Sequence, residues 1–164
     1  PTGSPDSRHA DAEGKSGGGE KTGGQTLNEE RIVNGELTSS PGTLLQDMRT
    51  LRDQAEFAFN RLLDVTAVDR GDAFEVLYRL NSWTMDRDLV VRVTLPAAEP
   101  RLPSVAGLWE TALFGEREVQ DMFGIEFTGH PDPRPLLAPE EGFGFFPLRK
   151  SYQLPGRPGQ SDGR

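Results

Sequence analysis

The segment from residue 62 to residue 95 constrains the fold most, because it holds three successive runs in which apolar and polar residues alternate. Such alternation predicts strands at 62–68, 73–82 and 88–95 that each bury one face. Polar turns at 69–72 and around Asp86 separate the runs. Links this short predict an antiparallel meander, whose apolar face a helix has to cover.

Two segments with helical spacing of apolar residues can cover that face. The first spans 43–52, where Thr43 can cap the helix; the second spans 104–122 and ends before Gly124. Gly115 lies inside the second segment, and an interior glycine costs about 0.5–1 kcal/mol relative to alanine. We therefore expect a bend at Gly115, or two separate pieces.

These elements predict an α+β, two-layer domain in which helices pack on a small mixed or antiparallel sheet. A short strand is expected at 125–127, and the proline- and glycine-bearing segment 130–148 predicts an irregular C-terminal arm. Residues 1–42 contain nine of the chain's 19 glycines and predict a disordered leader. The predicted domain therefore covers 43–150, and 151–164 is expected to be a tail.

Composition excludes several classes of function. A net charge of −8 disfavours nucleic acid as a partner, since phosphate binding requires a basic face. The chain has no cysteine, which excludes disulfides, thiolate nucleophiles and cysteine-held zinc or iron–sulfur clusters. No stretch approaches the roughly 20 apolar residues of a membrane helix. We expect a protein that is soluble or peripheral to a membrane.

Charged residues concentrate in segment 116–132. Arg117 and Asp121 are four positions apart on the predicted helix, so the guanidinium is expected to bridge carboxylates along one helix face. A metal site is the alternative, and its oxygen and imidazole ligands would be Glu118, Asp121, His130 and Asp132. No spacing among them matches a zinc signature, so we favour the ion-pair network.

Other features of the sequence give little support to catalysis. His9 lies in the predicted leader, so a histidine-based relay would depend on His130 alone, and no serine lies in a nucleophile motif. The phenylalanines at 143, 145 and 146 precede a basic end at 149–150. This apolar strip predicts docking onto a partner, although the rings can instead complete a small core.

The charged segment and the arm together resemble the C subunit of respiratory complex I. The family pattern is ERE, two residues, D-M/L-F-G-I, x-F-x-G-H-P-D, and PLRK after a loop. The matching positions are Glu116-Arg117-Glu118, Asp121-Met122-Phe123-Gly124-Ile125, Phe127, Gly129-His130-Pro131-Asp132, Arg134, Leu136-Leu137 and Pro147-Leu148-Arg149-Lys150. With looser similarity in the first two predicted strands, the resemblance covers about residues 43–153.

This resemblance implies a non-catalytic subunit in the peripheral arm of a proton-translocating NADH:quinone oxidoreductase. Such a chain binds no cofactor or metal itself; FMN, iron–sulfur clusters and quinone belong to partner subunits. It implies packing against the quinone-site subunit (D-like) and iron–sulfur subunits (B-like and I-like), on the cytoplasmic side of the cell membrane, with the membrane reached only through partners. The implied interface residues are Glu116, Arg117, Glu118, Asp121, Phe123, Gly124, His130, Pro131, Asp132, Arg134, Phe145, Pro147, Leu148, Arg149 and Lys150.

Departures from the family pattern keep alternatives open. Segment 112–115 reads Ala-Leu-Phe-Gly where complex I members usually have alanine, asparagine and tryptophan. After PLRK, this chain has Ser151 where the family usually has an acidic residue. These features resemble the related subunits of membrane-bound nickel–iron hydrogenases and formate hydrogenlyases. A free-standing soluble binding module and a carboxylate-dependent hydrolase are further alternatives.

Overall fold

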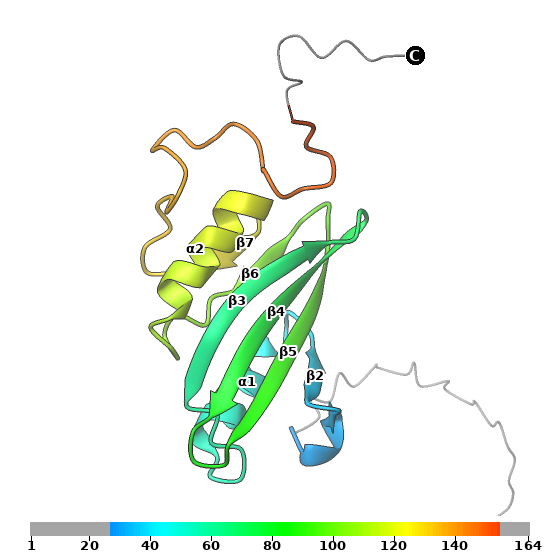
Figure 1. Cartoon of the computed structure of the whole chain (residues 1–164), viewed down its shortest axis with the longest axis vertical. Helices are drawn as coiled ribbons and strands as arrows, with labels where there is room; N and C mark the ends of the chain where they lie inside the picture. Colours follow the sequence, from blue (N-terminus) through cyan, green and yellow to red (C-terminus); the bar gives the residue numbers. More distant parts are fainter. Residues whose placement is uncertain (1–26, 155–164) are drawn as a thin grey trace, which may run out of the picture.

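The main sheet of this protein has five strands in the order β1-β2-β5-β4-β3 (Figure 1). The computed structural model describes residues 27–154, so the predicted leader up to residue 26 and the predicted tail from residue 155 lie outside the described residues. The elements in chain order are η1 (Glu29–Arg31), β1 (Ile32–Val33), β2 (Glu36–Ser39), α1 (Leu44–Asp53), β3 (Arg61–Asp69), β4 (Ala73–Ser82), β5 (Arg87–Pro96), β6 (Arg101–Pro103), α2 (Ala112–Phe123) and β7 (Glu126–Thr128).

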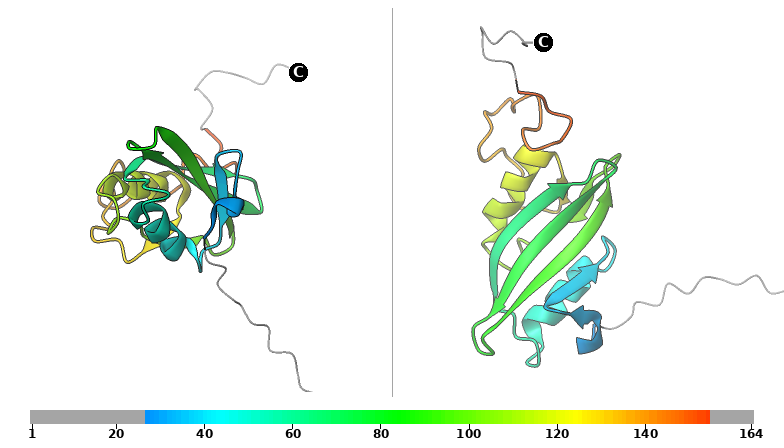
Figure 2. Two further views of the ribbon diagram at one scale, coloured as in Figure 1. Left: turned by 90° about the horizontal axis from the view of Figure 1, so that it is seen from below. Right: turned by 45° about the vertical axis from the view of Figure 1, so that its right-hand side comes forward.

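The predicted meander is confirmed: β3 pairs antiparallel with β4, and β4 pairs antiparallel with β5. Alternation places Tyr78 on β4 and its partner Val91 on β5 on the same buried face. Both helices lie on one face of the sheet, as Figure 2 shows, and cover these side chains. The two-layer α+β fold follows from this arrangement.

The predicted domain boundary at residue 43 is wrong, because the domain begins earlier in the chain. β2 lies at 36–39 and pairs parallel with β5, so the sheet is mixed. Leu37 is fully buried, and Arg92 on β5 forms ion pairs with both Glu36 on β2 and Glu75 on β4. A strand of four residues is too short to show a clear alternation of apolar and polar residues. Pairing with β5 stabilises this strand, and the local sequence does not reveal that pairing.

The second helix differs from the prediction at its start and at Gly115. Residues 104–111 form turns, and α2 begins only at Ala112. The helix continues through Gly115 without ending there, so the expectation of two separate pieces is wrong, and the expected bend stays a prediction. A Cβ at Gly115 would lie 3.0 Å from the Cβ of Val65, which shows how closely α2 approaches β3. The glycine therefore permits close packing of helix on strand.

A second, smaller sheet lies beside α2, where β6 pairs parallel with β7. The strand expected at 125–127 is confirmed to within one residue as β7. Gly124 ends α2 with a φ of 70°, a left-handed conformation that glycine adopts without strain. Among residues 27–154, no helix combines the length and apolar character that a bilayer crossing requires.

Candidate functional site

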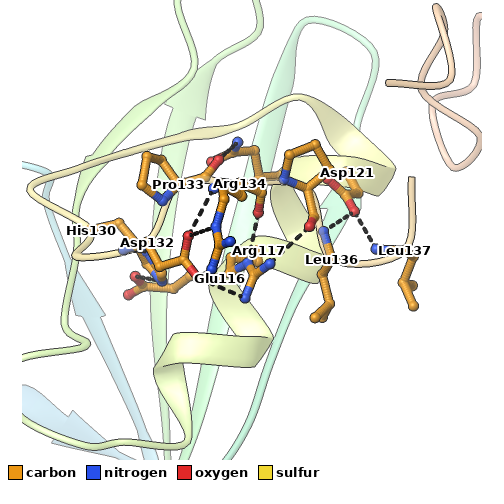
Figure 3. A network of polar contacts seen from close by, with 11 residues as sticks. Glu116, Arg117, Asp121, His130, Asp132, Pro133, Arg134, Leu136 and Leu137 are labelled. Atoms are coloured by element: carbon orange, nitrogen blue, oxygen red, sulfur yellow. Dashed lines mark hydrogen bonds and ion pairs between the residues drawn. The ribbon is translucent and has the colours of Figure 1, made fainter. Parts of the chain in front are cut away.

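The structure brings most of the predicted interface residues together where α2 meets the segment 129–138 and the chain that follows it (Figure 3). Glu116, Arg117 and Asp121 project from the helix toward this segment. Glu118 lies on the exposed side of α2. Side chains and backbone groups of the helix and the segment form one connected polar network.

Arg117 attaches this segment to α2 through backbone carbonyls. Its Nε donates to the carbonyl oxygen of Arg134 at 2.7 Å, and its Nη2 donates to that of Pro135 at 2.8 Å. Its Nη1 lies 3.4 Å from the Asp132 carboxylate. A planar guanidinium presents five N–H donors in a fixed arrangement, which suits three acceptors at separate positions.

Asp121 does not form the predicted bridge with Arg117, and that prediction is wrong. Its Oδ2 instead accepts hydrogen bonds from three consecutive backbone amides, those of Leu136, Leu137 and Ala138, at 2.8, 2.7 and 3.1 Å. A buried carboxylate with three N–H donors is well compensated for its loss of water. Arg117 and Asp121 on α2 therefore both bind the segment 134–138 of the arm.

Asp132 carries the ion pairs of the turn. Its carboxylate receives Arg134 Nε at 2.7 Å and Nη2 at 2.8 Å. The bonds from Arg134, with a smaller contribution from Arg117, hold the pKa of Asp132 well below its usual value. Because the Arg134 side chain is 80% exposed, this pair contributes little to stability.

Glu116 is the only acid of the ERE motif that is fully buried. Its Oε2 accepts from the Ser104 hydroxyl at 2.5 Å, and its Oε1 accepts from the Val105 amide at 2.7 Å. Burial raises its pKa to about 7, although both hydrogen bonds lower it. The Tyr78 hydroxyl, also buried, has a pKa raised by burial and by the Glu116 charge.

We expect Glu116 to make folding stability depend on pH. The folded pKa is about 7 against an ordinary value of 4.5, so the folded protein binds more protons between these values. Its contribution is complete below pH 4.5 and is lost as pH rises through 7, with a loss of about 3 kcal/mol. Urea unfolding at pH 4.5 and 7.5 should show this fall for the wild type and not for Glu116→Gln. An equal fall in both proteins would contradict the assignment.

His130 lies between the buried acid and the turn, with its side chain 2% exposed. Its Nδ1 accepts a hydrogen bond from the Asp132 amide at 3.0 Å. Its Nε2 lies 3.9 Å from Glu116 Oε2 and has no hydrogen-bond partner. The metal alternative gains no support, because the described residues contain no group of three potential ligands that could hold an ion.

The PLRK segment turns back onto its own domain. Arg149 Nε donates to the carbonyl of Phe123 at 2.6 Å, and its guanidinium lies over the rings of Phe74 and Phe146. The Leu148 amide donates to the Met122 carbonyl at 3.2 Å. Part of this motif therefore fixes the arm at the end of α2; contact of its exposed parts with a partner stays a prediction.

Asp69 is a member of the network that the sequence does not identify. Its Oδ2 accepts from the Lys150 amide at 2.8 Å and its Oδ1 from the Gly71 amide at 2.7 Å. These bonds, that from Lys150 first, lower its pKa despite partial burial. In the sequence Asp69 carries only a turn signal, because its long-range partner is 81 residues away.

The arm exposes apolar side chains beyond these fixed points. Phe145 is 44% exposed and stacks between Phe143 and Tyr152, and Leu148 is 56% exposed. Phe146 lies against Gly124. In the predicted apolar strip, Phe146 therefore packs on the domain, and both Phe145 and Phe146 remain partly exposed. The arm is therefore attached to the domain at several points and exposes an apolar surface between them.

Comparison with known proteins identifies the family. Residues 37–158 match the family described as the 30 Kd subunit of respiratory-chain NADH dehydrogenase. The chain belongs to this family. It is 42% identical over 132 residues to the C subunit of NADH-quinone oxidoreductase from Azorhizobium caulinodans, covering 77% of this chain and 61% of that protein. It is 45% identical over 108 residues to NADH-quinone oxidoreductase subunit 5 of Thermus thermophilus, covering 58% and 52%.

Two solved structures superpose on this fold. A trypsin-resistant fragment of Nqo5 superposes with a TM-score of 0.53 at 36% identity, over 59% of this chain and 80% of the fragment. A chain of an archaeal respiratory complex, the membrane-bound sulfane sulfur reductase, gives 0.62 at 26% identity, over 73% and 71%. The 30 Kd subunit relatives from Azorhizobium and Thermus are longer, and the present chain spans 61% and 52% of their lengths.

Proposed function

We propose that this chain is a non-catalytic scaffolding subunit of the peripheral arm of a proton-translocating NADH:quinone oxidoreductase. The observation that carries the proposal is the arm itself: α2 fixes segment 132–138 through Arg117 and Asp121, and the chain beyond it exposes apolar side chains. An apolar surface on a rigid support is typical of a site that a partner protein covers. The names of the relatives agree with an oxidoreductase complex.

The partners in this proposal are the quinone-site subunit and the neighbouring iron–sulfur subunits. FMN, iron–sulfur clusters and quinone are held by those partners, and a chain without cysteine cannot supply thiolate ligands to a cluster. The chain would lie on the cytoplasmic side of the membrane and reach it through partners. Its acidic surface would itself be repelled by anionic lipid.

Affinity isolation of the tagged protein from detergent-solubilised host membranes tests this function. Mass spectrometry should find a flavin-bearing NADH-oxidising subunit together with the quinone-site subunit. Recovery of a nickel-binding large subunit would instead assign the chain to a hydrogenase or formate hydrogenlyase. Recovery of the chain alone would favour a free-standing binding module.

Arg117→Ala is expected to weaken assembly while the electron-transfer centres of the complex stay chemically intact. The substitution removes both carbonyl contacts and the Asp132 contact, so the bond from the Gln120 side chain to the Pro133 carbonyl, at 3.2 Å, is what still joins segment 132–135 to α2 among these contacts. We expect at least a severalfold lower yield of intact complex on native gels, with normal iron–sulfur spectra per assembled complex. Arg101→Ala is the control, because this exposed arginine forms surface ion pairs with Glu99 and Glu126 and is not among the predicted interface residues. Full assembly with selectively lost turnover would argue for a direct catalytic role.

A further inference from the structure

A buried carboxyl group and a buried imidazole face each other beneath the turn at 129–132. Glu116 Oε2 lies 3.9 Å from His130 Nε2, which is beyond hydrogen-bond length. Both side chains are almost completely removed from solvent. A buried N–H donor without an acceptor is costly, so the unpaired Nε2 requires an explanation.

The turn itself determines which imidazole nitrogen carries the proton. Because the Asp132 amide donates to His130 Nδ1, that nitrogen presents a lone pair, and the proton of the neutral ring is on Nε2. A second proton would have to occupy Nδ1 and would break the bond to Asp132. The closed turn therefore requires a neutral imidazole with its Nε2–H directed at Glu116.

Two buried donors in the surroundings of Glu116 have no hydrogen-bond partner within the described part of the chain, and of these His130 Nε2 lies 3.9 Å from a carboxyl oxygen of Glu116. The Ser104 hydroxyl and the Val105 amide, from the loop before α2, already donate to the carboxyl group. The Tyr78 hydroxyl on β4, whose pKa burial and the Glu116 charge raise, is the second of these donors, and the neighbouring Arg117 is directed to the arm and to Asp132. No arginine or lysine among residues 27–154 forms an ion pair with Glu116.

We propose that Glu116 and His130 form a latch: on ionisation, Glu116 accepts a hydrogen bond from His130 Nε2 and thereby holds the imidazole that closes the turn through Asp132. The proton leaves Glu116 for solvent, and the imidazole keeps its own. His130 also lines a surface pocket of about 560 Å³, which brings solvent close to the pair. A bond to a charged acceptor is roughly twice as strong as one to a neutral carboxyl group. The latch acts within this chain and does not depend on the proposed assembly.

Hydrogen exchange of the Asp132 amide in the full chain tests the latch. The protection factor, which is the intrinsic exchange rate divided by the observed rate at each pH, should rise about tenfold between pH 6 and pH 8. The midpoint is expected near pH 7, where Glu116 ionises. Global stability should fall over the same range, so a general change in stability would not mimic the rise. Glu116→Gln should abolish the rise, and Glu118→Gln, at the exposed acid of the same motif, should preserve it.

Two results would overturn the latch: a protection factor that does not change with pH in the wild type, or an unchanged rise in Glu116→Gln. A second measurement covers the case in which Glu116→Gln does not fold. The chain has two histidines, so His9→Ala leaves His130 as the one source of imidazole signals in a long-range proton–nitrogen spectrum. At pH 8 the spectrum should show the Nε2-protonated form. The Nδ1-protonated form at that pH would also overturn the proposal.

Discussion

Replacing Asp121 with alanine is expected to release residues 136–138 from α2 and to lower the free energy of unfolding by about 3 kcal/mol. One carboxylate oxygen accepts three backbone amides, and hydrogen bonds to charged groups contribute about 1.5–3 kcal/mol each when the site is buried. The estimate is below the sum of three bonds, because the freed amides can recover water at the surface. Urea unfolding measures the loss, and hydrogen exchange at 136–138 shows where it occurs.

Two matched variants isolate the role of this carboxylate. Asp121→Asn retains an oxygen acceptor without the charge, so its loss should be about half that of alanine. Glu118→Ala removes an exposed acid from the same helix and should change stability by less than about 0.5 kcal/mol. Equal losses in Asp121→Ala and Glu118→Ala would mean that the three amide contacts do not hold the arm.

Gly124→Ala is expected to lower the free energy of unfolding by about 3 kcal/mol and to displace the arm. The residue has a φ of 70°, which costs a side-chain-bearing residue about 1–2 kcal/mol. An added Cβ would also overlap the ring of Phe146, which the Arg149 guanidinium covers at 4.3 Å. Moving that ring disturbs the contacts that hold Arg149 at the end of α2.

Gly129→Ala separates backbone strain from this overlap. Gly129 has a φ of 78°, yet nothing lies within 4 Å of the position of its Cβ. Its substitution should therefore cost only the conformational part, about 1–2 kcal/mol. In a Phe146→Ala background, the cost of Gly124→Ala should fall to that of Gly129→Ala. Equal costs of the two alanine variants in the wild-type background would show that Phe146 yields freely.

Much of the fold could be predicted from the sequence, because the meander depends on local alternation. Each of β3, β4 and β5 has enough residues for a period of two to be visible, and short turns dictate their antiparallel pairing. The missed element, β2, has four residues and pairs with a strand more than 50 positions away. Helix propensity alone misjudges Gly115, because it ignores the close approach of Val65.

Prediction of the site succeeded for its location and failed for its contacts. The charged residues do gather where the helix meets the arm, as their density in the sequence indicated. Arg117 and Asp121 do not pair with each other, because both side chains bind backbone groups of the segment that follows β7. Helical spacing alone does not reveal these partners, which lie outside the helix. The burial of Glu116 and the exposure of Glu118 are likewise invisible in the sequence, since both are acids of one motif.

The parallel pairing of β2 with β5 also bears on the order in which the chain folds. Thr38 pairs with Arg92, so docking of β2 closes a loop of more than 50 residues, whereas turns of a few residues join β3, β4 and β5. Loop-closure entropy makes the longer closure costlier by about 2 kcal/mol. The meander can thus form as a nucleus from local contacts, and the parallel strand β2 adds to it late. Completion of the sheet then requires β2 to find the free edge of a β5 strand that has already paired with β4.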